Sequence, residues 1–290
     1  MARTPSLFRA IPDPWRGRIG LRRLRRWIRA TRFATGHNQK VAADAPRINF
    51  YPMRPEPNAS IAYVVGRLGA RVGFDPSAAG LTIAWDTGTW FSAAAARSLP
   101  DSALNARCLD ISKATVDRIW SEVSGYSIAV DPLTTEGPIV VKPDENGTRG
   151  GRVAEGPILR RVPGMVYQRL VDTRVGDRVL QIRPVILRGR IILVYEKWRP
   201  YPQWFKGPEL TIPKITANFF SDDEVALLLL FANAIGLDYG ELDVVREGEG
   251  GRIYVVDANR TPVRPQGLPD ESVEAAFRPQ AEAFAALISR

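Results

Sequence analysis

The sequence contains very little cysteine and histidine. Its 290 residues include one cysteine, Cys108, and one histidine, His37. A single thiol excludes an internal disulfide, and the two residues together are too few for a zinc site of the usual ligand type. His37 lies in a basic N-terminal segment, which argues against a Ser–His or Cys–His nucleophile. If the chain is an enzyme, its chemistry must come from carboxylates, lysines, arginines and hard metal ions.

Long hydrophobic runs are also missing. The longest apolar run, Val225 to Gly236, is interrupted by Asn233 and is too short to cross a bilayer. The first forty residues lack the continuous apolar stretch of a secretory signal. The composition, 45% hydrophobic and 24% charged, is typical of an ordinary folded protein. We therefore expect a cytoplasmic protein that divides into two or three lobes.

Acidic residues are nearly absent from the N-terminal segment. Residues 1–40 hold eleven of the 40 Lys and Arg residues but one acid, Asp13, of 31. The remaining chain holds 29 basic and 30 acidic residues, so a nearly neutral protein follows a segment of charge +10.

Residues 15–33 predict a short Arg-rich helix, because Leu21, Leu24 and Ile28 follow helical spacing. Two interpretations stay open. The helix either contacts an anionic membrane or another polyanion, or docks its narrow apolar stripe on the body of the protein. A transit peptide is a third option, which the shortage of serine disfavours.

Beyond residue 45 the pattern is that of a mixed α/β (α+β) chain. The expected strands are 47–51, 81–85, 137–143, 165–171, 179–187, 190–196, 240–246 and 252–257, and the expected helices are 59–68, 112–125, 223–235 and 270–288. Ser221 and Glu224 have the spacing of a capping box at the start of the third of these helices. The first elements form a small βαβ-like lobe.

The closing hairpin carries the strongest group of candidate site residues. Asp257 and Asn259 are two residues apart, so alternation places them on one face of their strand. Hairpin pairing brings Asp243 towards the same face. Carboxylate and amide oxygens are the ligands that Mg²⁺ prefers. The alternative is an ordinary turn before Pro262, since Asp and Asn favour turns.

Two further segments contain residues suited to nucleotide binding. Lys142 ends a strand and precedes the glycine-rich loop 146–151, whose amides can cradle phosphate. This is not a Walker A loop, because the lysine precedes the glycines. Farther along, Arg183 interrupts an apolar strand, and a charge in that position needs a partner, either an acidic side chain or a phosphate.

The order and spacing of these elements resemble the ATP-grasp superfamily, which includes D-alanine–D-alanine ligase, glutathione synthetase, the ribosomal-protein glutamate ligases and tubulin–tyrosine ligase. The likeness covers about residues 100–265. It implies the ATP-grasp fold, with ATP and Mg²⁺ held between two α+β lobes. The implied segments are a basic arm at 1–44, a βαβ-like lobe at 45–104, a lobe with the phosphate loop at 105–165 and a C-terminal lobe with the metal site at 166–290.

The resemblance also implies roles for single residues. The nucleotide phosphates would meet Lys113, Lys142, Gly147, Gly150 and Gly151. Adenine would pack against a hinge of Tyr167, Gln168 and Leu170, and either Asp177 or Gln181 would face the ribose. Asp243, Asp257 and Asn259 match the metal ligands, and Arg183 matches the arginine that contacts the transferred phosphate.

Three positions depart from the pattern of the family. Gln168 stands where the hinge often has glutamate, and Asp257 replaces the commoner glutamate. Some amino-acid ligases carry an arginine just before the first metal aspartate, where this chain has the stretch Gly240-Glu241-Leu242-Asp243. Stabilisation of the oxyanion is then expected from Arg183, Lys197 or Arg260.

The resemblance implies a ligase that activates a carboxylate as an acyl phosphate and transfers it to an amine or a thiol. The alternatives are a kinase that phosphorylates a hydroxyl and a non-catalytic nucleotide-binding protein at a membrane. Expected partners are a small-molecule or peptide carboxylate, an amine acceptor and a second copy of the chain. Nucleic acid is disfavoured, because only the basic arm supports it. The aromatic, basic stretch 195–206 is expected to face the substrate.

Overall fold

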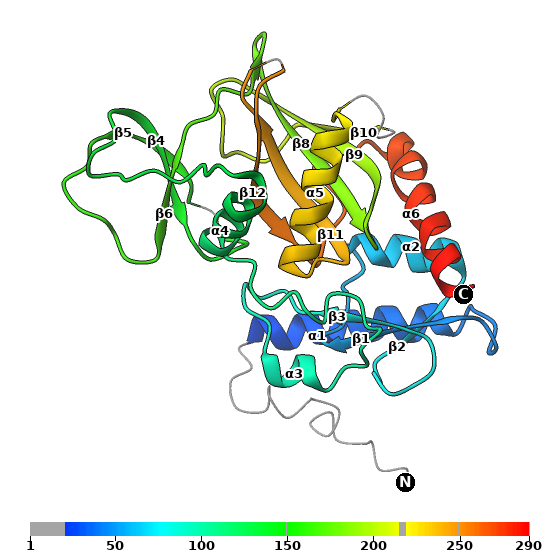
Figure 1. Ribbon diagram of the computed structural model, residues 1–290. Coiled ribbons are helices and arrows are strands. Elements are labelled where there is room, and N and C mark those ends of the chain that lie inside the picture. The colour runs from blue at the N-terminus through cyan, green and yellow to red at the C-terminus, as the bar shows by residue number, and fades with distance from the viewer. Residues whose placement is uncertain (1–20, 149, 215–218, 249, 290) are drawn as a thin grey trace.

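The computed structural model describes residues 21–148, 150–214, 219–248 and 250–289 (Figure 1). The N-terminal part contains helices α1 (Leu21–Asn38), α2 (Ser60–Leu68) and α3 (Ala93–Arg97) with strands β1 (Arg47–Pro52), β2 (Arg71–Gly73) and β3 (Leu81–Trp85). These strands form a parallel sheet in the order β2-β1-β3. The expected βαβ unit is therefore present. Gly69 ends α2 in the left-handed conformation, as its position in the sequence predicts.

A small antiparallel sheet follows helix α4 (Lys113–Ser124). Its strands are β4 (Gly137–Pro143), β5 (Arg152–Gly156) and β6 (Met165–Arg169), in the order β5-β4-β6. Ser112 caps α4 by accepting from the amide of Thr115, and Gly125 ends it with a φ of 81°. The helix therefore begins at Lys113, one of the predicted phosphate lysines.

The largest sheet is antiparallel and has the order β10-β9-β8-β11-β12, with β7 added beside β8. Its strands are β7 (Arg174–Val175), β8 (Arg178–Leu187), β9 (Arg190–Pro200), β10 (Leu210–Lys214), β11 (Tyr239–Arg246) and β12 (Ile253–Asn259). Helix α5 (Asp222–Ile235) precedes β11, and the predicted capping box of Ser221 and Glu224 is present. After β12, the 3-10 helix η4 (Asp270–Ser272) leads into α6 (Val273–Ile288).

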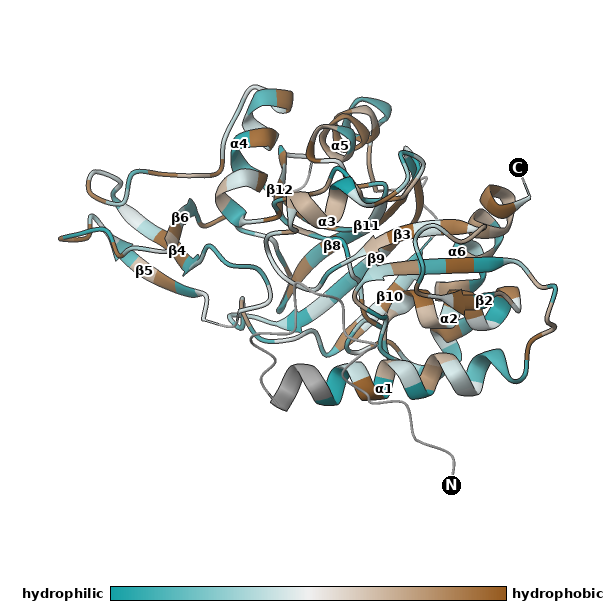
Figure 2. Cartoon of the chain, turned by 90° about the horizontal axis from the view of Figure 1, so that it is seen from below, coloured by the Kyte–Doolittle hydropathy of each residue, from teal (hydrophilic) through white to brown (hydrophobic). Residues whose placement is uncertain are grey.

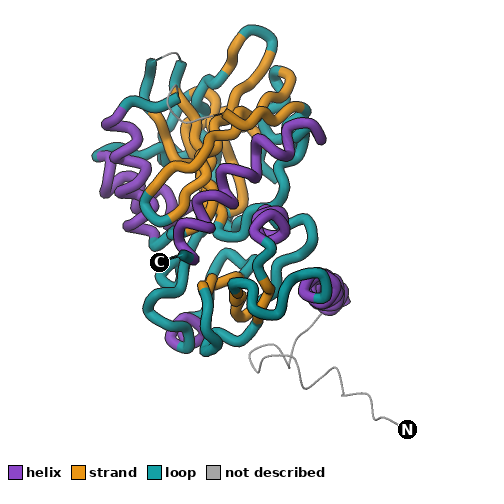
Figure 3. The backbone as a smooth tube through the Cα atoms, turned by 90° about the vertical axis from the view of Figure 1, so that its right-hand side faces the viewer, coloured by secondary structure: helices purple, strands orange, loops and turns teal. Residues whose placement is uncertain are grey.

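Helices cover the two faces of the large sheet differently. Trp120 of α4 and Phe231 of α5 pack with Ile182, Val194 and Leu242 on one face. The other face is half apolar and half polar. At its apolar end Val185, Leu193 and Tyr239 pack with Phe277 and Phe284 of α6, in a core that continues through α2 into the N-terminal sheet. Figure 3 shows the N-terminal lobe below the large sheet. The division of the chain into four domains remains a prediction.

Helix α1 packs along the N-terminal lobe. Ala30 and Ala34 are 1% and 2% exposed. Near the end of the helix, His37 Nε2 lies 2.7 Å from the carbonyl oxygen of Ala70, and Asn38 forms two hydrogen bonds with the backbone of Val72. The helix is therefore docked, but through Ala30 and Ala34, whereas Ile28 of the predicted stripe is only half-buried and the side chains of Leu21 and Leu24 are not described. Residues 15–20 of the predicted helix lie outside the described residues. Within the described part of the chain, no helix is long and apolar enough to cross a membrane.

Asn105 joins the N-terminal lobe to the large sheet. It is fully buried and has a φ of 61°, in the left-handed region. Its Oδ1 accepts from the amides of Asp238 and Tyr239, each at 2.8 Å, and its Nδ2 donates to the carbonyl of Tyr239 at 2.7 Å. These bonds fix the point at which β11 enters the sheet.

We predict that Asn105→Ala lowers the free energy of unfolding by about 3 kcal/mol, because two buried amides lose their acceptor. Asn105→Gly loses the same bonds but tolerates the positive φ, so it should be the milder change by about 1 kcal/mol. Urea unfolding monitored by circular dichroism measures both. Equal losses would show that the backbone conformation contributes nothing.

Candidate active site

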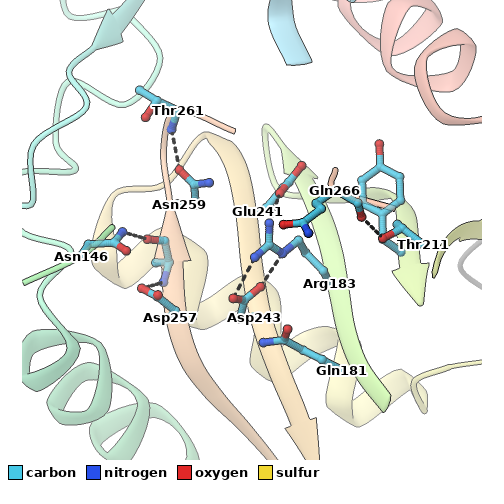
Figure 4. Close-up of polar contacts among 12 residues, drawn as sticks. Asn146, Gln181, Arg183, Thr211, Glu241, Asp243, Asp257, Asn259, Thr261 and Gln266 are labelled. Atoms are coloured by element: carbon cyan, nitrogen blue, oxygen red, sulfur yellow. Dashed lines mark hydrogen bonds and ion pairs between the residues drawn. The ribbon is translucent and has the colours of Figure 1, made fainter. Parts of the chain in front are cut away.

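The polar half of the large sheet forms the floor of the site (Figure 4). Asp243 of β11 lies directly opposite Asp257 of β12, and Glu241 lies opposite Asn259. Alternation puts these four residues on one face, which is also the face of Arg183 on β8. The predicted gathering of Asp243, Asp257 and Asn259 is therefore present.

Arg183 lies between two carboxylates. Its Nε and Nη2 donate to the two oxygens of Asp243, and its Nη1 donates to Glu241 Oε2 at 2.9 Å. Burial opposes the charge of Arg183, but the two carboxylates hold its pKa above the ordinary value. Of the two partners that the sequence allowed for Arg183, an acidic side chain or a phosphate, the structure shows acidic side chains.

The two floor aspartates have different electrostatic surroundings. Burial alone would raise the pKa of Asp243, but the charges of Arg183 and Lys197 hold it well below its ordinary value. Burial raises the pKa of Asp257. The charge of Lys113 lowers this pKa and the charge of Asp243 raises it, and the net shift is upward. Asp243 is therefore ionised at neutral pH.

Two adjoining cavities of about 300 Å³ each open above this floor. They share four lining residues, which are Lys113, Thr148, Asp243 and Asp257. The first cavity extends towards β6 and is also lined by Lys142, Gly150, Gly151, Gln168, Leu170, Gln181, Arg199, Trp204, Phe205 and Lys206. The second extends towards the N-terminal lobe and is also lined by Asn146, Gly147, Arg183, Glu241 and Asn259.

Both predicted lysines face the floor. Lys142 Nζ donates to the carbonyl of Val256 at 3.3 Å, and Lys113 Nζ donates to the carbonyl of Glu145 at 3.0 Å. Burial lowers the pKa of Lys142 to about 8, and the carboxylate of Asp257 opposes this shift. Lys113 thus lines both cavities together with the carboxylate pair, and Lys142 lines the first with it.

The loop after β4 is held at its start. Asn146 donates from Nδ2 to the carbonyl of Ala258 at 2.9 Å, and its amide donates to Thr89 Oγ1 at 2.8 Å. Asp144 accepts from the amide of Ala114 in the first turn of α4. The loop therefore enters the site between α4, β12 and the N-terminal lobe.

The hinge prediction is partly correct in position. Gln168, which is 3% exposed, and Leu170 line the first cavity. Tyr167 does not, because its ring packs with Ile139 and Val141 and its hydroxyl accepts from the amide of Val162. On β6, Tyr167 thus faces the small core and Gln168 faces the first cavity.

Asp177 and Gln181, the two candidates for a ribose contact, lie in different places. Asp177 lies in the exposed turn between β7 and β8 and lines neither cavity. Gln181 lines the first cavity and accepts from Arg199 Nη2 at 2.9 Å. Gln181 therefore replaces Asp177 as the candidate ribose contact.

Arg260 has a structural position. It is 1% exposed, and its three nitrogens donate to the backbone carbonyls of Asp86, Cys108 and Gly88. These bonds connect the end of β12 with the N-terminal lobe, and Arg260, unlike Arg183, lines neither cavity. The structure corrects the expectation that Arg260 stabilises an oxyanion.

Lys197 belongs to β9, which continues to Pro200, so the basic stretch 195–206 is strand before it becomes loop. Lys197 is 6% exposed and lines neither cavity. Burial, with the charge of Arg183, lowers its pKa to about 8. It lies opposite Gln181 in the pairing of β8 with β9. The loop residues Trp204 to Lys206 reach the first cavity instead.

Asn259 has a second role. Its Oδ1 accepts from the amide of Thr261 at 3.1 Å, so the turn interpretation is also correct, although a carbonyl oxygen keeps a second lone pair. Within the described ranges, no group of three or more His, Cys, Asp and Glu side chains could hold a metal ion. A metal on this floor would therefore need the amide beside the two aspartates.

Sequence reasoning did not single out Glu241 as a site residue. It is 1% exposed, lines the second cavity and leaves Oε1 without a hydrogen-bond partner among the described residues. Side chains alternate along a strand, so Glu241, two residues before Asp243, lies on the same face. This alternation was the signal in the sequence that could have identified Glu241.

Arg183→Leu should lower the free energy of unfolding by about 3 kcal/mol at neutral pH, because it leaves buried carboxylates unpaired. Asp243 has a depressed pKa in the folded protein, so its stabilisation is present at neutral pH and is lost as pH falls. The difference between wild type and variant should therefore shrink in acid. Arg178→Leu, at the exposed start of the same strand, is the control. Urea unfolding at several pH values measures the difference, and a pH-independent loss would contradict this account.

The comparisons with known proteins agree with this architecture. No family model and no curated protein matches the chain. Among solved structures, the ATP-grasp ligase PsnB with a minimal precursor shares 13% identity at a TM-score of 0.54, covering 84% of this chain and 99% of PsnB. The D-alanine–D-alanine ligase of Bacillus anthracis, solved with ATP, shares 14% identity at a TM-score of 0.51, covering 85% of this chain and 97% of the ligase. The chain therefore has the ATP-grasp fold.

Proposed function

We propose that the chain is a Mg²⁺-dependent, ADP-forming ligase that activates a carboxylate with ATP and joins it to an amine. The observation that carries the proposal is the carboxylate pair of Asp243 and Asp257, which lines both cavities together with Lys113 and the first cavity together with Lys142. Cations on one side and carboxylates on the other suit a metal–triphosphate complex.

The donor set fits Mg²⁺. Asp243, Asp257 and Asn259 offer hard oxygen ligands on adjacent strands, and the depressed pKa of Asp243 keeps its carboxylate charged. The bound ion would neutralise charge on the phosphates during transfer. A second structure of PsnB was solved with a phosphomimetic variant of the precursor, Mg and ADP, at 12% identity and a TM-score of 0.55 over 84% of this chain and 99% of PsnB.

The protein's own residues would position the nucleotide. Lys113 and Lys142 would neutralise phosphate oxygens, and Gly147, Gly150 and Gly151 leave room for backbone amides to approach them. Gln168 and Leu170 would contact adenine, and Gln181 the ribose. Such sites act mainly by positioning and charge neutralisation.

The transfer itself would occur in the second cavity. A carboxylate oxygen of the substrate attacks the γ-phosphorus, the bond to the bridging oxygen breaks, and ADP leaves with an acyl phosphate remaining. An amine nitrogen, or a thiol sulfur, then attacks the acyl carbon, and phosphate and a proton depart. Arg183, which lines this cavity, would stabilise the developing oxyanion, and Lys197 on the neighbouring strand would add positive charge. Since PsnB was solved with precursor peptides, peptide carboxylates belong with small molecules in the substrate search.

Release of ADP from a panel of carboxylates, including peptides with Asp and Glu, tests the proposal. Hydroxylamine should trap the acyl phosphate as a hydroxamate, and Asp243→Asn should reduce both products at least 100-fold. A kinase would release ADP and form a stable phosphoester without hydroxamate. ADP release that depends on no carboxylate would contradict the ligase proposal.

Affinity for Mg·ATP should fall as pH rises through about 8. Burial lowers the pKa of Lys142 to about 8, so the lysine loses its charge there, whereas bound phosphate favours the charged form. Calorimetry in two buffers of different ionisation enthalpy should therefore detect proton uptake just above this pH. Lys142→Arg keeps the charge at this position and should show less uptake. The same uptake in both proteins would contradict the assignment.

A further inference from the structure

One face of helix α1 packs against the N-terminal lobe, and the opposite face is exposed. The inner face carries Ala30 and Ala34, both buried, together with Trp27. Arg54 of the lobe lies 4.7 Å from the Trp27 ring and 3.9 Å from the Phe74 ring, and it donates to Thr31 Oγ1 at 2.6 Å. These contacts, with those of His37 and Asn38, fix the rotation of α1 about its axis.

The outer face presents a row of arginines. Arg25, Arg29 and Arg32 are exposed and follow the spacing i, i+4, i+7. At a rise of ~1.5 Å per residue they span roughly 10 Å along the helix. No ion pair or hydrogen bond joins them to another side chain in the part of the chain that the structure describes, whereas the neighbouring Arg26 pairs with Glu56 at 3.3 Å. The row therefore keeps its charge available.

Apolar side chains do not interrupt this row. Along residues 25–38 of α1, whose side chains the structure describes, none of the large hydrophobic residues is exposed. Figure 2 shows α1 at the edge of the molecule, with hydrophilic colours along much of its length. A partner at this part of the helix would therefore be held by charge at the surface.

The charge of the rest of the chain restricts the kind of partner. Residues 1–40 carry +10, and the remainder carries 29 basic against 30 acidic residues. A long polyanion that followed the body of the protein would meet no further excess of positive charge. A flat anionic surface would contact the helix alone, and each arginine near such a surface contributes favourably.

We propose that the outer face of α1 binds the anionic headgroups of a lipid bilayer peripherally. The docked inner face presents the arginines as a fixed row, so little ordering is needed on contact. Binding of this kind is electrostatic and weakens as salt rises. It is independent of the ligase chemistry proposed above.

Sedimentation of the full-length protein with vesicles tests the proposal. Vesicles of phosphatidylcholine with one-third phosphatidylserine should bind the protein at low salt, and vesicles of phosphatidylcholine alone should not. The variant R25Q/R29Q/R32Q should bind the anionic vesicles on the order of 100-fold more weakly, from the contribution of three arginines. The matched variant R152Q/R160Q/R178Q removes three exposed arginines from other surfaces and should bind as the wild type does.

Three results would overturn the proposal. Equal losses in the two triple variants would show that net charge alone drives binding. Equal binding to neutral and anionic vesicles would exclude headgroup recognition. Tighter binding to duplex DNA than to anionic vesicles would identify nucleic acid as the partner. Thermal unfolding of both variants verifies their folding, because the substituted side chains are exposed.

Discussion

Asp243 and Asp257 face each other across β11 and β12, and two carboxylates in such a buried position repel each other unless cations compensate them. Arg183 on β8 compensates Asp243 by binding both of its oxygens. Lys113 and Lys142, from α4 and β4, favour the charged form of Asp257. Five elements, β8, β11, β12, α4 and β4, therefore contribute to one balance of charge, which suits the metal and triphosphate proposed for this space.

The sheet that carries this pair is also anchored by its apolar end. Glu241 marks the boundary on β11, since Tyr239 on one side of it packs under α6 and Asp243 on the other side lines the cavities. Asn105 and Arg260 then bind the ends of β11 and β12 to the N-terminal lobe through backbone groups. A charged floor is thus built on a strand pair whose ends are anchored, which suits the positioning role proposed for the site.

Local signals in the sequence predicted much of this. The capping box at Ser221 and the alternation of Asp257 with Asn259 depend on neighbouring residues alone, and the structure confirms both. The side of β6 on which Tyr167 lies depends on the phase of pairing with β4, which no local pattern determines. The partners of Arg260 lie more than 150 residues away in sequence, so its structural role was not visible either. Glu241 was missed because the family comparison drew attention to an absent arginine and not to the carboxylate in its place.

Calorimetric titration with ATP, with and without Mg²⁺, tests most directly whether the carboxylate pair holds a metal–nucleotide complex. The account predicts Mg²⁺-dependent binding by the wild type and at least a tenfold loss of affinity in Asp257→Asn, with no change in Asp101→Asn, a substitution at an exposed turn. Wild-type affinity in Asp257→Asn, or binding that is the same without Mg²⁺, would contradict it.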